Sequence, residues 1–226
     1  ILRNNIRAMF IVSTVLLSSI LLGLLTVLNI HQVSGNMEAD VKALLTTKSS
    51  EISTRFDKRL GDIAGKTEGL SMTISAMPVY DKALVSSVIH QIILSDSMVF
   101  GSGVWFAPGR SPDAQYVYYG PYFSKDKDGS IKQTMEYCTP EYNYPQFAWY
   151  KHSMQGDKKV FWDEPAYDDV SRTSMLTSTA PIRSNGQVIG AVTVDIGLTE
   201  LEKYIRGITI GEHGYAFLVT QSGFYA

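Results

Sequence analysis

The chain has 226 residues, a formal net charge of −2, and a composition that is 45% hydrophobic and 11% aromatic. This composition is typical of a folded globular protein, and its weakly acidic balance argues against a disordered polar chain and against a nucleic-acid-binding surface. Cys138 is the only cysteine, so no intrachain disulfide can form and an apolar core must stabilise the fold, which favours a bacterial or archaeal surface protein.

The first predicted element is a transmembrane helix over residues 9–30. These 22 residues contain no charge and no proline, and a helix of this length is about 33 Å long, enough to cross a bilayer. Arg3 and Arg7 precede it, so the positive-inside rule predicts a cytoplasmic segment over residues 1–8 and residues 31–226 outside the plasma (inner) membrane. A cleaved signal peptide is the alternative, but the apolar run exceeds the usual length and no A-x-A-like site follows it.

A long amphipathic stalk helix is predicted over residues 31–76. Apolar or small residues recur there at steps of three, four or their sums, separated by polar residues. The recurring positions are Val41, Leu44, Leu45, Ile52, Phe56, Leu60, Ile63, Ala64, Leu70 and Ile74. So long a helix cannot bury its stripe in one small domain, so we expect a homodimer through the membrane-near half. The distal half could instead lie wholly on its own domain.

An α+β module with an antiparallel sheet flanked by helices is predicted over residues 77–198. Pro78 ends the stalk helix. The predicted helices cover residues 80–94 and 147–154, and the predicted strands cover residues 99–107, 115–123, 131–137, 159–162, 176–182 and 188–196. The Asn185-Gly186 step joins the last two strands as a hairpin. Because the strands follow one another without βαβ alternation, one antiparallel sheet is expected.

Residues 199–226 are predicted to form a connecting helix over 199–208 and, from Gly214, the first strand of a second module. The chain opens on Ile1 and closes inside an apolar, aromatic run. We therefore expect a fragment of a longer protein.

No catalytic or metal-binding motif stands out. The sequence lacks a G-x-S-x-G elbow, an H-E-x-x-H motif, a P-loop and a G-x-G-x-x-G motif. The turn at residues 126–129 has only part of a calcium loop, and the four histidines lack metal-ligand spacing. They are His31, His90, His152 and His213. We expect neither a metal nor a cofactor.

The candidate ligand site is a block of aromatic and acidic residues. Ring faces attract a cation and a carboxylate fixes it, so such a block can enclose a small ligand with a positive nitrogen. The alternative is that the rings are core and the acids are solvated. The block contains Tyr142, Tyr144, Phe147, Trp149, Tyr150, Phe161, Trp162 and Tyr167, with Asp163, Glu164, Asp168 and Asp169.

Tyr142, Trp149 and Tyr150, followed by Asp195 in the last strand of the module, resemble the motif of the double Cache (dCache) family. These are PAS-like sensor domains of bacterial transmembrane receptors: methyl-accepting chemotaxis proteins, sensor histidine kinases and diguanylate cyclases. The resemblance covers nearly the whole chain. It implies a membrane-distal Cache module over residues 77–198, and the start of a truncated membrane-proximal module within residues 199–226. It also implies extracytoplasmic small-molecule sensing, most often by a chemoreceptor.

One motif position departs from the amino-acid-binding members of this family. Phe147 stands where they have an arginine, which the resemblance implies would hold the ligand's carboxylate while aspartate and aromatic side chains receive its ammonium. Ala166 also stands where relatives often have tyrosine, with Asp168 at the acid. We therefore expect an amine or another amino-acid-like ligand rather than a standard α-amino acid. The expected ligand-binding residues are Tyr142, Phe147, Trp149, Tyr150, Tyr167, Asp168 and Asp195.

Signal input without catalysis is the leading hypothesis for function, with a kinase, cyclase, phosphatase or chemotaxis output outside this chain. Two alternatives remain open. One is a membrane-anchored hydrolase in which Asp163 or Glu164 pairs with Asp168, since such carboxylate pairs occur in glycosidases. The other is an adhesin or scaffold, whose pocket would be filled by its own side chains.

Overall fold

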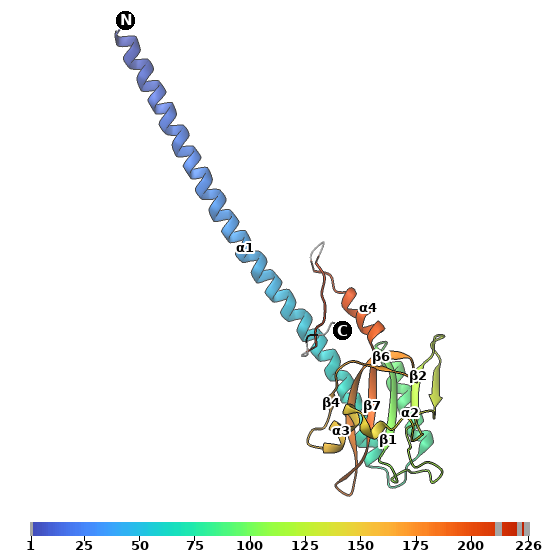
Figure 1. Ribbon diagram of the computed structural model, residues 1–226. Helices are drawn as coiled ribbons and strands as arrows, with labels where there is room; N and C mark the ends of the chain where they lie inside the picture. The colour runs from blue at the N-terminus through green and yellow to red at the C-terminus, as the bar shows by residue number, and fades with distance from the viewer. Residues whose placement is uncertain (1, 211–213, 221–222, 224–226) are drawn as a thin grey trace. The chain divides into compact units, whose positions relative to one another are not determined.

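The computed structural model describes residues 2–210, 214–220 and 223, with only the backbone of residues 2–8. It divides into two compact units, Ile1–Thr54 and Arg55–Ala226, which we describe separately. The elements in Figure 1 are α1 (Leu2–Ser75), α2 (Lys82–Ser95), β1 (Val99–Phe106), β2 (Tyr122–Lys125), β3 (Ile131–Thr134), a 3-10 helix (Tyr144–Gln146), α3 (Ala148–Gln155), β4 (Phe161–Trp162), β5 (Ala166–Asp168), β6 (Thr173–Ser184), β7 (Gln187–Gly197) and α4 (Leu198–Arg206).

The first unit is helical and contains the apolar segment predicted from the sequence. A stretch of α1 has a mean hydropathy of 2.4 and no buried residue, so it is long and apolar enough to cross a membrane. Its hydroxyl side chains donate to carbonyl oxygens one turn back: Thr14 to Phe10 at 2.6 Å and Thr26 to Leu22 at 2.8 Å. These bonds keep the hydroxyl groups paired without water.

The second unit is built on an antiparallel sheet. The strand order is β3-β2-β1-β7-β6-β4, and β5 pairs with β6. The longest pairing is the hairpin of β6 and β7. It turns at Asn185 and Gly186, whose φ angles of 49° and 78° lie in the left-handed region that Asn-Gly turns favour. The α+β prediction is therefore confirmed, including this hairpin.

Side chains of β7 alternate between the two faces of the sheet. Val192, Val194 and Ile196 enter the main core, together with buried residues of α2 and of the C-terminal part of α1. The residues between them, Thr193 and Asp195, point the other way and line a cavity. The period-two geometry of a strand thus separates an apolar core face from a polar face.

The sequence prediction was wrong in three places. The strand predicted over 115–123 begins only at Tyr122, because Pro121 cannot donate a ladder hydrogen bond and Tyr119 makes only an isolated bridge to Phe106. The short strand β5 was not expected. Over 214–220 the structure has isolated bridges and no extended strand, while residues 221, 222 and 224–226 lie outside the described part of the chain.

Two buried hydrogen bonds fix α1 to β6. The hydroxyl groups of Thr67 and Ser178 lie 2.9 Å apart and are hydrogen-bonded, and neither residue is exposed to solvent. One turn further along α1, the Ser71 hydroxyl donates to the carbonyl oxygen of Pro181 at 2.6 Å. Buried polar pairs of this kind allow little sliding, because a displaced hydroxyl would be left without a partner.

We expect Thr67→Val to lower the free energy of unfolding by about 1–3 kcal/mol, because it keeps the side chain's shape but leaves the Ser178 hydroxyl buried and unpaired. Adding Ser178→Ala should recover most of the lost stability, since neither polar group then remains. Urea unfolding followed by tryptophan fluorescence measures both variants. Losses that simply add in the double variant would contradict this account of the pair.

Candidate functional site

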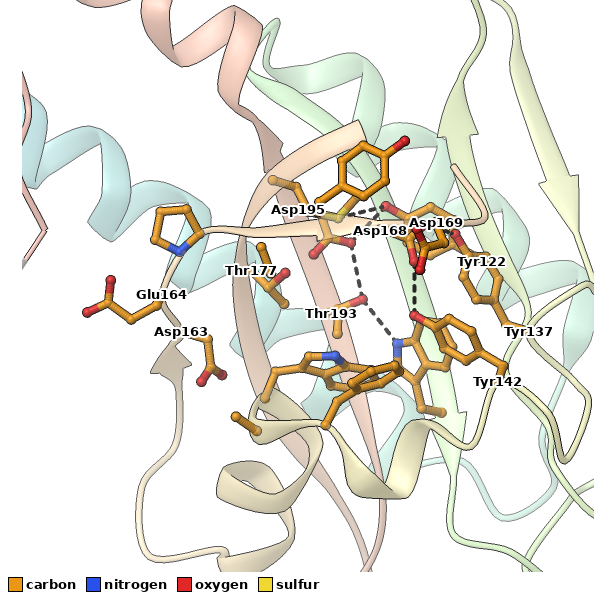
Figure 2. A pocket seen from close by; sticks show the side chains of 18 of the residues that line it. Tyr122, Tyr137, Tyr142, Asp163, Glu164, Asp168, Asp169, Thr177, Thr193 and Asp195 are labelled. Carbon is orange, nitrogen blue, oxygen red and sulfur yellow. Dashed lines mark hydrogen bonds between the residues drawn. The ribbon is translucent and has the colours of Figure 1, made fainter. Parts of the chain in front are cut away.

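A cavity of about 510 Å³ lies on the polar face of the sheet. Strands β1, β2, β6 and β7 supply its back, α3 and the loop before it supply one wall, and the segment 163–169 crosses its front (Figure 2). The lining residues are Trp105, Tyr122, Tyr137, Tyr142, Phe147, Ala148, Trp149, His152, Asp163, Glu164, Pro165, Ala166, Tyr167, Asp168, Asp169, Met175, Thr177, Thr193 and Asp195.

Asp195 is the most deeply buried acid of the cavity, with 2% of its surface exposed. Its Oδ2 accepts a hydrogen bond from the Tyr122 hydroxyl at 2.9 Å, and the Thr193 hydroxyl lies 3.4 Å from the same oxygen. Burial raises the pKa of Asp195 to about 7, and hydrogen bonds from Thr177 and Tyr122 oppose the rise. Burial therefore favours the protonated form of this carboxyl group far more than in an exposed aspartate.

Tyr122 reaches Asp195 because β1 has a glycine at the crossing point. A Cβ atom at Gly101 would lie only 2.3 Å from the Tyr122 hydroxyl oxygen. The pKa of Tyr122 is raised well above its usual value by burial, with the charge of Asp195 adding to the effect. Tyr122 therefore acts as a hydrogen-bond donor that holds the Asp195 carboxyl in place.

An aromatic wall surrounds Trp105. The Trp105 ring centroid lies 5.0 Å from that of Trp149 and 6.3 Å from that of Tyr142, the latter in a stacked arrangement. Phe147 continues the wall by stacking on Trp149 at 6.3 Å. The indole nitrogen of Trp105 donates to the Thr193 hydroxyl at 3.1 Å, which fixes the ring beside Asp195. Ring faces in this setting can attract a cation.

Asp168 fastens the front segment to the aromatic wall. Its carboxylate accepts from the hydroxyl groups of Tyr137 at 2.6 Å and Tyr142 at 3.1 Å, and from the backbone N–H of Ser171 at 2.7 Å. These three hydrogen bonds orient both tyrosine rings and hold the front segment in place. The pKa values of Tyr137 and Tyr142 are raised, chiefly by burial, so both groups stay protonated donors.

Six of the seven residues expected to bind ligand line the cavity: Tyr142, Phe147, Trp149, Tyr167, Asp168 and Asp195. Tyr150 does not. Successive residues of a helix point about 100° apart, so Trp149 faces the cavity while Tyr150 turns into the protein. Tyr150 is 4% exposed and its ring lies 5.2 Å from that of Tyr144. We therefore leave Tyr150 out of the ligand contacts considered below.

Sequence reasoning missed the residues that β1, β2 and β6 contribute, above all Trp105, Tyr122 and Thr177. A signal was present for the first two, because glycines inside a strand mark places where another group approaches closely. Gly101 and Gly103 precede Trp105 in β1, and a Cβ atom on Gly103 would lie 2.7 Å from the Trp105 ring. No group of three or more His, Cys, Asp or Glu residues placed to hold a metal occurs among the described residues.

An antiparallel sheet flanked by helices, with a cavity on one face, has the PAS-like fold of sensor domains. The family model described as "Methyl-accepting chemotaxis protein-like, first PDC sensor domain" matches residues 85–203, more than half of the chain. The chain belongs to this family.

Known proteins with similar sequence and structure agree with that assignment. The methyl-accepting chemotaxis protein TlpA of Bacillus subtilis is 32% identical over 101 residues, which are 44% of this chain and 15% of TlpA. The matched region is thus a small part of that relative. Methyl-accepting chemotaxis protein X has the same fold, with a TM-score of 0.66 and 20% identity over 80% of this chain and 71% of the other. The ligand-binding domain of the Pseudomonas aeruginosa amino acid chemoreceptor PctC, solved with GABA, has a TM-score of 0.50. Its sequence identity is 22%, and the match covers 80% of this chain and 70% of that domain.

The raised pKa of Asp195 predicts a pH dependence of stability. Between the usual aspartate pKa near 4 and about 7, the folded protein holds a proton that the unfolded chain has released, so stability falls as pH rises through this range. Asp195→Asn cannot ionise, and we expect it to match the wild type near pH 4 and to be more stable near pH 8. The difference should grow by up to about 1.4 kcal/mol per pH unit.

Urea unfolding at several pH values measures this difference, and Asp157→Asn on an exposed loop is the control. Identical pH profiles for Asp195→Asn and wild type would show that Asp195 ionises normally in the folded protein.

Proposed function

We propose that this chain is the ligand-sensing input region of a membrane-anchored chemoreceptor, and that its ligand is a small molecule with a cationic amine. The observation that carries the proposal is the buried carboxyl of Asp195, which faces a cavity with an aromatic wall. Family membership supports the sensing role. The amine is inferred from the chemistry of the cavity.

The charges of the cavity favour a cation. Among the described residues that line it there are five acids, one histidine and neither lysine nor arginine. A ligand carboxylate would therefore meet negative charge without a strong partner. An ammonium group at Asp195 would compensate the cost of ionising a buried acid, and the rings of Trp105 and Trp149 would add cation–π attraction of about 0.5–2 kcal/mol.

Ligand contacts are proposed for Tyr142, Phe147, Trp149, Tyr167 and Asp195, with Trp105 added. Asp168 is proposed to act near the ligand mainly by positioning Tyr137 and Tyr142. The same contacts weaken the hydrolase alternative, because they engage the Asp168 carboxylate in holding Tyr137 and Tyr142. The open cavity also argues against a scaffold whose pocket is filled by its own side chains.

We propose the following layout for the chain. Residues 1–8 are cytoplasmic, 9–30 cross the plasma membrane, 31–76 form the stalk, 77–198 form the membrane-distal module, and 199–226 lead into a membrane-proximal module. The apolar stripe of the stalk supports a homodimer, since Val41, Leu44 and Leu45 are each at least half exposed in the single chain.

We predict that butylamine raises the melting temperature of the purified chain and that Asp195→Ala abolishes this shift, because the ammonium then loses its carboxylate partner. Asp157→Ala, on an exposed loop away from the cavity, should keep the shift. A thermal-shift assay with amines, amino acids and organic acids measures it. An equal shift in Asp195→Ala would place the ammonium contact elsewhere, and stabilisation by organic acids alone would contradict a cationic ligand.

The stalk proposal predicts a difference between two cysteine variants. Leu45→Cys, on the apolar stripe, should form disulfide-linked dimers in membranes under mild oxidation. Ser50→Cys, about 140° away around the helix, should not. Cys138 is buried and should give little background. Equal cross-linking of the two variants, measured by non-reducing electrophoresis, would argue against a stripe-mediated dimer.

A further inference from the structure

Asp163 and Asp195 lie in one row across neighbouring strands. The pairing of Trp162 with Ser178 places Asp163 opposite Thr177, and the Asp163 backbone N–H donates to the Thr177 carbonyl oxygen at 3.1 Å. Thr177 pairs in turn with Asp195. Opposed residues of antiparallel strands project from the same face, and adjacent strands are about 4.8 Å apart, so the two aspartate backbones are roughly 10 Å apart.

The three residues of this row all line the cavity, with Thr177 between the two acids (Figure 2). Asp195 and Asp163 therefore mark two separate negative positions on one wall. A monoamine held by Asp195 carries only one positive charge and would leave the charge of Asp163 uncompensated.

Asp163 has a carboxylate oxygen that the described residues leave without a partner. Its Oδ1 lies 3.0 Å from the Nδ1 of His152, while its Oδ2 is buried and makes no hydrogen bond. The side chain is only 12% exposed. Burial raises the pKa of Asp163, and the neighbouring His152 opposes the rise. A buried acid with an unused oxygen is costly, and a cation beside it removes that cost.

Asp163 differs in this respect from Asp168. Tyrosine hydroxyls and a backbone N–H already satisfy Asp168, whereas Asp163 has only the half-exposed imidazole of His152. The second negative position is thus available to a ligand.

We propose that the ligand is a short α,ω-diamine whose two ammonium groups bind Asp195 and Asp163 at the same time, with its methylene chain against the aromatic wall. This inference rests on the proposed function and narrows its ligand class. With the carboxylates at the roughly 10 Å spacing of their backbones, two charge-assisted contacts of about 2.8 Å along the line between them leave roughly 4–5 Å between the nitrogens, which suits a short chain of about three or four methylenes.

Three probes with four carbon atoms each test the inference: putrescine, butylamine and GABA. They share one ammonium end and carry a second ammonium, a methyl group or a carboxylate at the other. Isothermal titration of the purified full chain should show putrescine binding about tenfold or more tightly than butylamine, because it gains a charge-assisted contact. GABA should bind more weakly than butylamine, because its carboxylate would approach Asp163.

The decisive variant is Asp163→Asn, which keeps the size of the side chain and removes its charge. It should weaken putrescine about tenfold and leave butylamine unchanged, so that butylamine binding also reports an intact fold. Asp157→Asn should change neither affinity, and Asp195→Asn should weaken both amines.

Equal affinities for putrescine and butylamine, or equal losses of both in Asp163→Asn, would overturn the diamine while leaving a monoamine sensor in place. Tighter binding of GABA than of putrescine would also overturn it. Binding of neither amine would remove the proposed function together with this inference.

Discussion

The fold and the site both depend on the alternation of side chains along the central strand β7. Val192, Val194 and Ile196 pack into the apolar core, while Thr193 and Asp195 line the cavity on the opposite face. A shift of one residue in register would put a carboxylate into the core and apolar side chains into the cavity, so the same contacts that stabilise the sheet also place the acid. The long pairing with β6, set by the Asn185-Gly186 turn, keeps this register.

The sequence was sufficient for features encoded by local periodicity. The 3.6-residue stripe predicted the long helix, and the Asn-Gly step predicted the β6–β7 hairpin. The sequence was insufficient to predict elements in which tertiary contacts override the local preference of the chain. The aromatic run at 115–121 has strong β propensity, yet Pro121 has no N–H to donate to β1 and Tyr119 makes only an isolated bridge. Strand β5 is only three residues long, and its pairing with β6 gives no periodic signal.

The candidate site was predictable to the extent that its residues are close in sequence. Tyr142, Phe147, Trp149 and Asp168 fall in one dense aromatic and acidic block, and Asp195 was found through the family motif. Trp105 and Tyr122 come from strands that precede that block, and only the strand order brings them beside it. Tyr150 lies outside the cavity lining because neighbours on a helix diverge in direction, which a run of adjacent aromatic residues in the sequence does not show.

Residues 177 and 178 of β6 connect the cavity on one face of the sheet to helix α1 on the other. Thr177 touches the cavity, and its immediate neighbour Ser178 is hydrogen-bonded to Thr67 on α1. Two adjacent residues of β6 therefore contact the cavity and the helix, so a small rotation of the strand about its own axis would displace both side chains together. A ligand that favoured one orientation of β6 would therefore favour one arrangement of this contact with α1.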